Sequence, residues 1–160
     1  MHSQDVIRRK VVAFVLRIAP SGQPEILLHS FVSDPDLPHR LPGGGVDPGE
    51  SVEQAIQREL HEETGFSEWK TGRKLGVQSY FKPYINAHVE RHDFLVHADL
   101  DVPDAWENQV HGEGDDAGMT FRFEWRGSRS LKNIDEEHRP FIESDYIPEL
   151  FESSQEDKIL

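Results

Sequence analysis

Three glutamates fall on or beside the apolar side of one predicted helix, over residues 52–64. At about 100° per residue, Glu59 and Glu63 continue the apolar stripe and Glu62 lies at its flank. The stripe consists of Val52, Ala55, Ile56 and Leu60. Bringing like charges together toward a core is costly, so something must neutralise them, and an all-oxygen set suits hard cations such as Mg²⁺ or Mn²⁺. A solvated acidic face is the alternative, but the angular placement argues against it.

Local signals define both ends of this helix. Pro48-Gly49 supplies a turn, and Ser51 with Gln54 three residues later forms a capping-box pattern. Gly65 falls where a left-handed C-terminal stop is expected. The sequence therefore predicts a helix over 52–64 that follows a turn and, before it, a glycine loop.

The stretch from Gly44 to Phe66 resembles the signature of the Nudix hydrolases at every specified position. That signature reads Gly, five residues, Glu, seven residues, Arg-Glu-apolar, one residue, Glu-Glu, one residue, Gly-apolar. The matching residues are Gly44, Glu50, Arg58, Glu59, Leu60, Glu62, Glu63, Gly65 and Phe66. The resemblance implies an α/β (α+β) fold, the Nudix-like α/β/α sandwich with a mixed β-sheet. It also implies hydrolysis of a diphosphate linkage in a nucleoside diphosphate derivative or similar small molecule, by water attack at phosphorus.

Carried over onto this sequence, the resemblance assigns roles to individual residues. The ligands of Mg²⁺ or Mn²⁺ would be Glu59, Glu62, Glu63 and the carbonyl of Gly43, and Glu62 would share the role of catalytic base. Glu50 and Arg58 would form an ion pair that fixes the loop against the helix. Gly44 would be required because the chain turns tightly beside the metal, where a Cβ would intrude.

A second acidic stretch, HGEGDDAG at 111–118, comes directly before a predicted strand. Several Nudix enzymes take a further acidic residue from a loop in such a position. We favour Glu113 as the general base or additional ligand, with Asp115 and Asp116 as rivals. The alternative is a solvated acidic loop without a catalytic role.

Other residues are candidates for substrate binding. Arg40, just before the glycine loop, would contact phosphate, and Tyr84 lies roughly where a tyrosine marks some dinucleoside polyphosphate hydrolases. An exposed surface arginine and a core or turn tyrosine are the alternatives. His88, Glu90 and His92 share one face of a predicted strand, which would suit a second metal site or line the substrate pocket. Such a face is more often simply polar.

The composition excludes several classes of function. The chain has 17 Lys+Arg and 30 Asp+Glu, a net charge of -13, which repels nucleic acid and anionic membranes. An anionic substrate therefore needs a metal or a few placed cations. There is no cysteine, hence no thiol nucleophile or disulfide, and we expect a cytoplasmic location. No stretch approaches the length of a membrane span.

The remaining patterns indicate a single domain over 1–160 with flexible ends at 1–6 and 152–160. Strands are predicted at 11–18, 25–29, 74–82, 88–97 and 121–125. The first two should form a hairpin at the edge of a sheet. A turn of helix is expected around Trp106, and 136–151 shows a helix pattern that Pro148 interrupts. Together these elements predict a mixed sheet covered by helices.

Two other functions compete with hydrolysis. A catalytically inactive Nudix-fold domain that binds nucleotides or regulates a partner would be expected to have lost part of the acidic set, which is intact here. An isomerase acting on an isoprenoid diphosphate would need a cysteine nucleophile. Removal of a nucleotide cap from RNA is disfavoured, because the negative net charge of the chain repels nucleic acid. We expect a small phosphorylated substrate and no membrane partner, and homodimers are common in the family.

Overall fold

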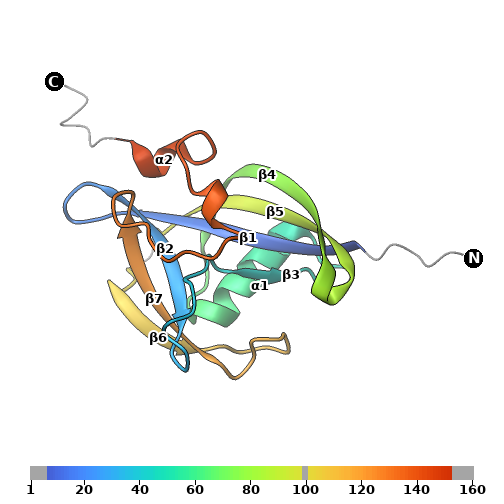
Figure 1. Cartoon of the computed structure of the whole chain (residues 1–160). Helices are drawn as coiled ribbons and strands as arrows, with labels where there is room; N and C mark the ends of the chain where they lie inside the picture. Colours follow the sequence, from blue (N-terminus) through green and yellow to red (C-terminus); the bar gives the residue numbers. More distant parts are fainter. Residues whose placement is uncertain (1–6, 99–100, 153–160) are drawn as a thin grey trace, which may run out of the picture.

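The computed structural model describes residues 7–98 and 101–152, so most of the predicted flexible ends lies outside the described residues. The elements are β1 (Ile7–Ile18), β2 (Pro24–Phe31), β3 (Gly43–Gly45), α1 (Val52–Thr64), β4 (Lys70–Lys82), the 3-10 helix η1 (Pro83–Ile85), β5 (Ala87–His97), β6 (Ala105–Gln109), β7 (Thr120–Gly127), the 3-10 helix η2 (Arg139–Phe141) and α2 (Pro148–Phe151). Figure 1 shows their arrangement. In the described part of the chain, no helix is long and apolar enough to cross a membrane.

The strands form one mixed sheet in the order β4-β5-β1-β2-β7-β6, with β3 pairing β1. β1 runs parallel to β5 and antiparallel to β2, which confirms the predicted mixed sheet. Along its other edge β1 changes partner, since Lys10 pairs with Gly45 of β3 whereas Leu16 pairs with Ile26 of β2. β2 and β3 therefore follow different halves of β1.

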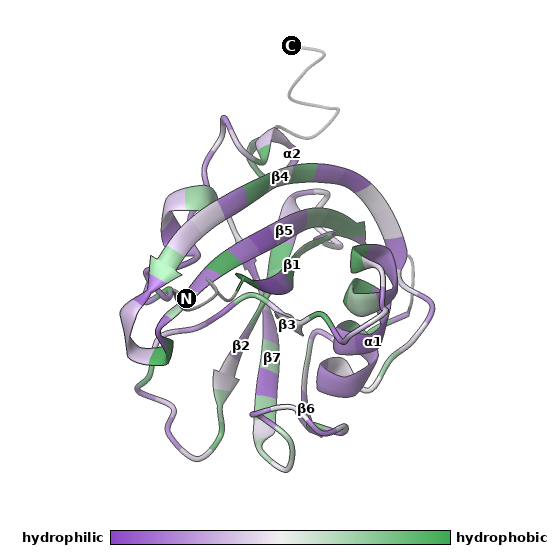
Figure 2. Ribbon diagram, turned by 90° about the vertical axis from the view of Figure 1, so that its right-hand side faces the viewer, coloured by the Kyte–Doolittle hydropathy of each residue, from purple (hydrophilic) through white to green (hydrophobic). Residues whose placement is uncertain are grey.

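Two apolar layers cover the two faces of the sheet. The first, against α1, contains Val11, Ala13, Val15, Leu27, Ala55, Ile56 and Leu60. The second, against the C-terminal segment, contains Val12, Phe14, Leu16, Ile134, Ile142, Ile147 and Leu150. Because alternate residues of β1 enter opposite layers, its continuous apolar run is buried on both faces. Figure 2 shows α1 beside the strands on one side of the sheet.

The predicted hairpin forms, but its expected place at the edge of the sheet is wrong. β1 lies between β5 and β2, and β2 lies between β1 and β7, so the outermost strands are β4 and β6. The reason is that the apolar runs of β1 and β2 need cover on both faces, which only central strands receive.

Two predictions in the second half of the chain are also wrong. Trp106 lies in the strand β6, which pairs antiparallel with β7, and not in a turn of helix. The 136–151 segment forms only η2 and the four-residue α2, because Pro148 lacks an N–H and can occupy only the first turn of a helix. Its apolar residues Ile142, Ile147 and Leu150 still cover the sheet.

Candidate active site

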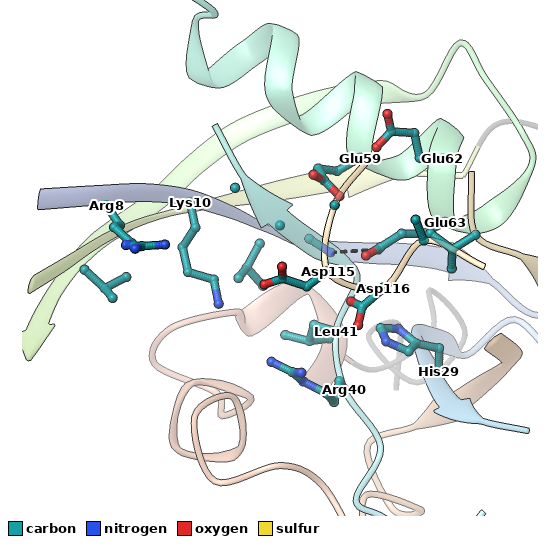
Figure 3. Close-up of a pocket in the computed structure, with 18 of the residues that line it drawn as sticks. Arg8, Lys10, His29, Arg40, Leu41, Glu59, Glu62, Glu63, Asp115 and Asp116 are labelled. Atoms are coloured by element: carbon teal, nitrogen blue, oxygen red, sulfur yellow. Dashed lines mark hydrogen bonds between the residues drawn. The ribbon is translucent and has the colours of Figure 1, made fainter. Parts of the chain in front are cut away.

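A cavity of about 340 Å³ lies beside β3 and the first half of β1. One side, the acid wall, consists of Glu59, Glu62 and Glu63 from α1 with Asp115 and Asp116 from the β6–β7 loop. The other side, the basic wall, consists of Arg8, Lys10, Arg40 and Lys82. Figure 3 shows the glutamates on the α1 side, Lys10 and Arg40 away from them, and the two aspartates between. The two sides of this cavity thus carry charges of opposite sign.

The helix that carries the glutamates has the predicted bounds and caps. Ser51 Oγ accepts from the Gln54 N–H over 3.0 Å, and Gln54 Oε1 accepts from the Ser51 N–H over 2.9 Å. Gly65 ends the helix with a φ of 85°. These caps fix where the helix starts and stops, and hence which residues face the sheet.

The C-terminus of α1 is held by a strand that the sequence analysis did not predict. Three carbonyls of its last turn accept hydrogen bonds from β6 and from His111 in the loop that follows it. The bonds run from Trp106 Nε1 to Thr64 O, from Asn108 Nδ2 to Glu63 O and from the His111 N–H to Glu62 O, over 2.9, 2.9 and 3.0 Å. Since these carbonyls have no partner within the helix, β6 both satisfies them and anchors the end that carries the acids.

Burial changes the protonation of the acid wall. Glu63 is 3% exposed, and burial followed by the charge of Glu59 raises its pKa well above the ordinary value. The Gly43 N–H donates to Glu63 Oε1 over 3.0 Å. Burial raises the pKa of Glu59 to about 7 against the opposing effect of Arg58. Burial also raises the pKa of Asp116.

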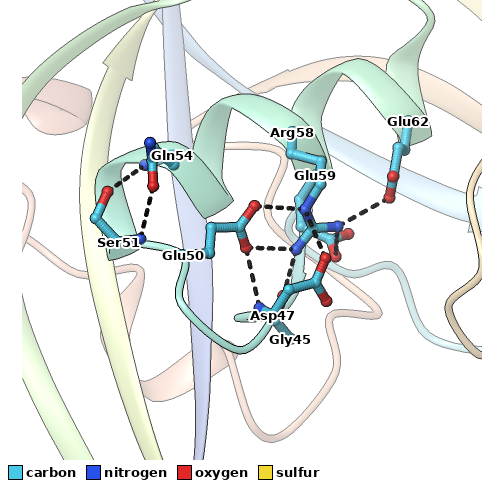
Figure 4. Close-up of polar contacts among 8 residues, drawn as sticks. All are labelled: Gly45, Asp47, Glu50, Ser51, Gln54, Arg58, Glu59 and Glu62. Carbon is cyan, nitrogen blue, oxygen red and sulfur yellow. Dashed lines mark hydrogen bonds and ion pairs between the residues drawn. The ribbon is translucent and has the colours of Figure 1, made fainter.

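Arg58 connects the glycine loop to the acid wall, as Figure 4 shows. Its Nε and Nη2 donate to the two carboxylate oxygens of Glu50 over 2.7 and 2.9 Å, which is the predicted ion pair. Nη1 donates to Glu59 Oε1 and to Glu62 Oε1, each over 3.0 Å, and Nη2 donates to the Gly45 carbonyl over 2.7 Å. A single guanidinium thus orients two acids of the wall and ties β3 to α1.

Replacing Arg58 by lysine should destabilise the protein although the charge is retained. A lysine ammonium has three donors and cannot reproduce the fork that binds Glu50 through two bonds. We expect a loss of about 2 kcal/mol in the free energy of unfolding, a fall in Tm of roughly 4–8 °C for a chain of this size. The matched control is Arg139→Lys, whose partner Glu136 is exposed, and thermal unfolding of both variants is the measurement. Equal shifts would contradict the assigned role of Arg58.

Gly44 is needed for space and not for a turn. It lies in the extended strand β3, which corrects the tight turn expected there. A Cβ at this position would meet the carboxylate of Glu59, as the sequence analysis anticipated in expecting a Cβ to intrude. At Gly43, a Cβ would meet the carbonyl oxygen of Val11 on the neighbouring strand. The absence of side chains at these positions keeps β3 close to both β1 and the acid wall.

The other candidates divide into those that line the cavity and those that do not. Arg40 and Tyr84 line it, although Tyr84 is 78% exposed, with Lys82 Nζ 5.0 Å from its ring centre. Asp115 and Asp116 also line it. Glu113 is exposed and is not among the lining residues. The loop therefore brings Asp115 and Asp116 to the acid wall and leaves Glu113 outside.

The histidines of β5 lie elsewhere. His92 Nε2 is 2.7 Å from Glu90 Oε1, and the His88 ring packs against Phe81. None of His88, Glu90 and His92 lines the cavity. This face of β5 is therefore a polar face whose side chains contact other residues of the chain. Within the described residues, it does not line the cavity, and its three side chains do not form a group that could hold a metal ion.

Sequence reasoning missed most of the basic wall and the residues around it. Lys82 Nζ lies 2.8 Å from Glu137 Oε1, and Lys10 Nζ lies 4.0 Å from the other oxygen of Glu137. Burial lowers the pKa of Lys10 to about 8. Two buried histidines, His29 and His138, also line the cavity. The period of two along β1, which puts Arg8 and Lys10 on one face, was the available signal.

The acid wall fits a divalent cation by chemistry, although its side chains are not gathered around one point. Within residues 7–98 and 101–152, no three His, Cys, Asp or Glu side chains are close enough together to hold a metal ion as they stand. The donor set is nevertheless oxygen-only, and burial disfavours the charged forms of Glu59 and Glu63, a cost that a cation would offset. Glu59 and Glu62 instead each accept a hydrogen bond from the Arg58 guanidinium, whose single positive charge is shared with Glu50.

Comparisons with known proteins identify the family of the chain. The family profile described as the NUDIX domain matches residues 8–144. A Bacillus subtilis (strain 168) protein named "Putative 8-oxo-dGTP diphosphatase" is 48% identical over 66 residues, 41% of this chain and 40% of that protein. The match thus spans about two fifths of this relative.

Solved structures share the fold. The crystal structure of a UDP-X diphosphatase has a TM-score of 0.61 at 21% identity, over 94% of this chain and 64% of that one. The MutT protein from Methanosarcina mazei Go1 has a TM-score of 0.59 at 21% identity, over 87% and 92% of the two chains. At this identity the likeness shows the fold alone, and it confirms the predicted α/β (α+β) class with a mixed sheet.

Proposed function

The chain belongs to the Nudix family, and from that premise we propose that it is a metal-dependent pyrophosphohydrolase. Its substrate would be a nucleoside diphosphate derivative or a similar small molecule, cleaved at a diphosphate linkage by water attack at phosphorus. The observation that carries the proposal is the cavity in which the acid wall faces the basic wall. The name of the Bacillus subtilis relative adds oxidised nucleoside triphosphates to the substrates worth testing.

The acid wall would hold the cation through Glu59, Glu62 and Glu63, with the carbonyl of Gly43 as a further ligand. When bound, Mg²⁺ or Mn²⁺ would neutralise phosphate charge and polarise the phosphoryl oxygens. Arg58 would keep two of the carboxylates oriented, through its bonds to Glu59 and Glu62.

The remaining steps fall to side chains of the cavity. The basic wall would bind the phosphates, which a chain with a net charge of -13 would otherwise repel. Asp116 takes the place of Glu113 as our favoured general base, because it is half-buried at the acid wall and Glu113 is not. Its raised pKa brings it nearer to neutrality, where a base accepts a proton from water most effectively. Glu62 remains the alternative base.

Stabilisation of the protein by Mg²⁺ should increase with pH. Glu59 has its pKa raised from 4.5 to about 7, so folding favours its protonated form, and metal-free stability falls as the pH rises through this window. For Glu59 alone that loss is on the order of 3 kcal/mol. A cation binds the deprotonated form. We therefore expect the rise in Tm on adding Mg²⁺ to grow from about pH 5 to about pH 8. A rise in Tm independent of pH would show that these carboxylates are not the ligands.

A substrate screen tests the proposed activity. Nucleotide sugars, dinucleoside polyphosphates, and nucleoside triphosphates with and without base oxidation would be incubated with Mg²⁺ or Mn²⁺. Phosphate, pyrophosphate and nucleotide products would then be quantified. We expect metal-dependent cleavage of at least one class, abolished by a chelator. Binding of these compounds without cleavage of any would favour the inactive, nucleotide-binding alternative. A homodimer, a single domain and a cytoplasmic location stay predictions.

A further inference from the structure

A buried histidine of the cavity has one ring nitrogen without a partner. His138 lies just before η2, is 2% exposed and lines the cavity. The backbone N–H of Leu41 donates to its Nδ1 over 3.1 Å. Since a neutral imidazole carries one proton, that proton must be on Nε2. Nε2 is buried and has no hydrogen-bond partner, and an unsatisfied buried donor costs about 1–3 kcal/mol.

The charges around His138 indicate what would satisfy this donor. Burial lowers the pKa of His138 well below its usual value, and the positive charges of Arg40, Lys10 and Arg91 lower it further. The ring is therefore neutral at physiological pH and its Nε2–H is a permanent donor. These three cations are close enough to lower the pKa of the ring. Their positive charge therefore favours an anionic acceptor for the Nε2–H over a neutral one. Two of them, Lys10 and Arg40, belong to the basic wall of the same cavity.

We propose that His138 is a substrate-binding residue, whose Nε2–H donates to a phosphate oxygen of the substrate while Arg40 and Lys10 supply the neutralising charge. The inference rests on the proposed function and deepens it. One phosphate of the substrate would lie away from the acid wall. It would occupy a subsite formed by the neutral donor of His138 and the two cations Arg40 and Lys10. The backbone N–H of Leu41, the residue after Arg40, orients the ring.

Two substitutions separate this role from a structural one. His138→Asn places an oxygen near the position of Nδ1, so it can still accept from the Leu41 N–H, but it removes the donor at Nε2. His138→Gln reaches the position of Nε2 with an amide N–H but leaves the Leu41 N–H without its acceptor. The first variant should thus lose the phosphate contact and the second should retain it.

The test is calorimetric titration with methylenediphosphonate, a non-hydrolysable diphosphate, in metal-depleted buffer. We expect His138→Asn to weaken binding about 10-fold, the value of a hydrogen bond to a charged acceptor, and His138→Gln to retain affinity within about threefold. The control is His39→Asn, because His39 also has a buried, unpartnered Nδ1 but does not line the cavity. That variant should bind as the unsubstituted protein does.

The outcomes separate this inference from the proposed function. Greater loss of binding in His138→Gln than in His138→Asn, with a lower Tm, would show a purely structural histidine and overturn the inference. Equal affinities in all variants, or no binding by the unsubstituted protein, would overturn it as well, whatever the hydrolysis screen yields. Binding that depends on His138 without hydrolysis of any diphosphate would remove the proposed function and leave the phosphate contact in place.

Discussion

Replacing Glu63 by glutamine should lower the rate of Mg²⁺-dependent hydrolysis at least about 100-fold while the protein remains folded. Glu63 is buried and its pKa is raised well above the ordinary value, so burial disfavours its charged form and favours the neutral acid in the metal-free protein. Glutamine mimics that neutral form in size, and its Oε1 can still accept from the Gly43 N–H. It cannot supply the negative charge that a divalent cation requires.

Steady-state rates and thermal unfolding, each with and without Mg²⁺, measure this effect. In the metal-free state at neutral pH the variant should be at least as stable as the unsubstituted protein, because the cost of a buried charge is removed. The gain in Tm on adding Mg²⁺ should disappear. Glu53→Gln is the matched control, since Glu53 lies on the same helix and is exposed. Near-normal turnover in Glu63→Gln would remove Glu63 from the metal site.

Replacing Asp116 by asparagine should lower the hydrolysis rate about 100-fold, the size expected for loss of a general base. Asp116 lines the cavity, and its charge contributes to the raised pKa of Glu63, which places the two carboxylates near one another. Asparagine keeps the shape of the side chain but cannot accept a proton from water. The measurement is kcat with saturating Mg²⁺.

The same loop provides the controls. Glu113→Gln should retain nearly full activity because Glu113 is exposed and outside the cavity. Asp115→Asn should have a smaller effect than Asp116→Asn, since Asp115 is exposed although it lines the cavity. A large loss confined to Glu113→Gln would restore the residue favoured from the sequence. Small losses of kcat in all three variants would indicate that the general base is a glutamate of α1.

The elements predicted correctly are those whose signals are local. The bounds of α1 follow from Ser51, Gln54 and Gly65, all within one turn of its ends. The inward placement of Glu59 and Glu63 follows from helical periodicity alone. The ion pair between Glu50 and Arg58 was predicted from the resemblance to the Nudix signature, and the structure contains this pair.

The elements that were missed depend on contacts between distant parts of the chain. β6 is short and polar, and it forms because it pairs with β7 while Trp106 and Asn108 hold the end of α1. No signal within 105–109 indicates either partner. The C-terminal segment was predicted from its apolar spacing, yet it packs on the sheet with only short helical turns. Burial was thus predictable there, whereas backbone conformation was not.

Most of the basic wall was missed because its members come from three separate segments, β1, the β2–β3 loop and β4. The position of Asp116 likewise depends on a tertiary contact, because the His111 N–H, at the start of the acidic stretch 111–118, donates to the Glu62 carbonyl at the end of α1. A shift of a few residues decides which acid reaches the cavity. Sequence spacing could identify the loop but could not choose among its three acids.

Calorimetric titration with Mn²⁺ is the most direct test of the claim that the acid wall of α1 holds a divalent cation. The structure predicts saturable uptake by the unsubstituted protein near pH 8 and loss of that uptake in the Glu59→Gln, Glu63→Gln double variant. It also predicts unchanged uptake in Glu53→Gln. No uptake by the unsubstituted protein, or equal uptake by the double variant, would contradict the account.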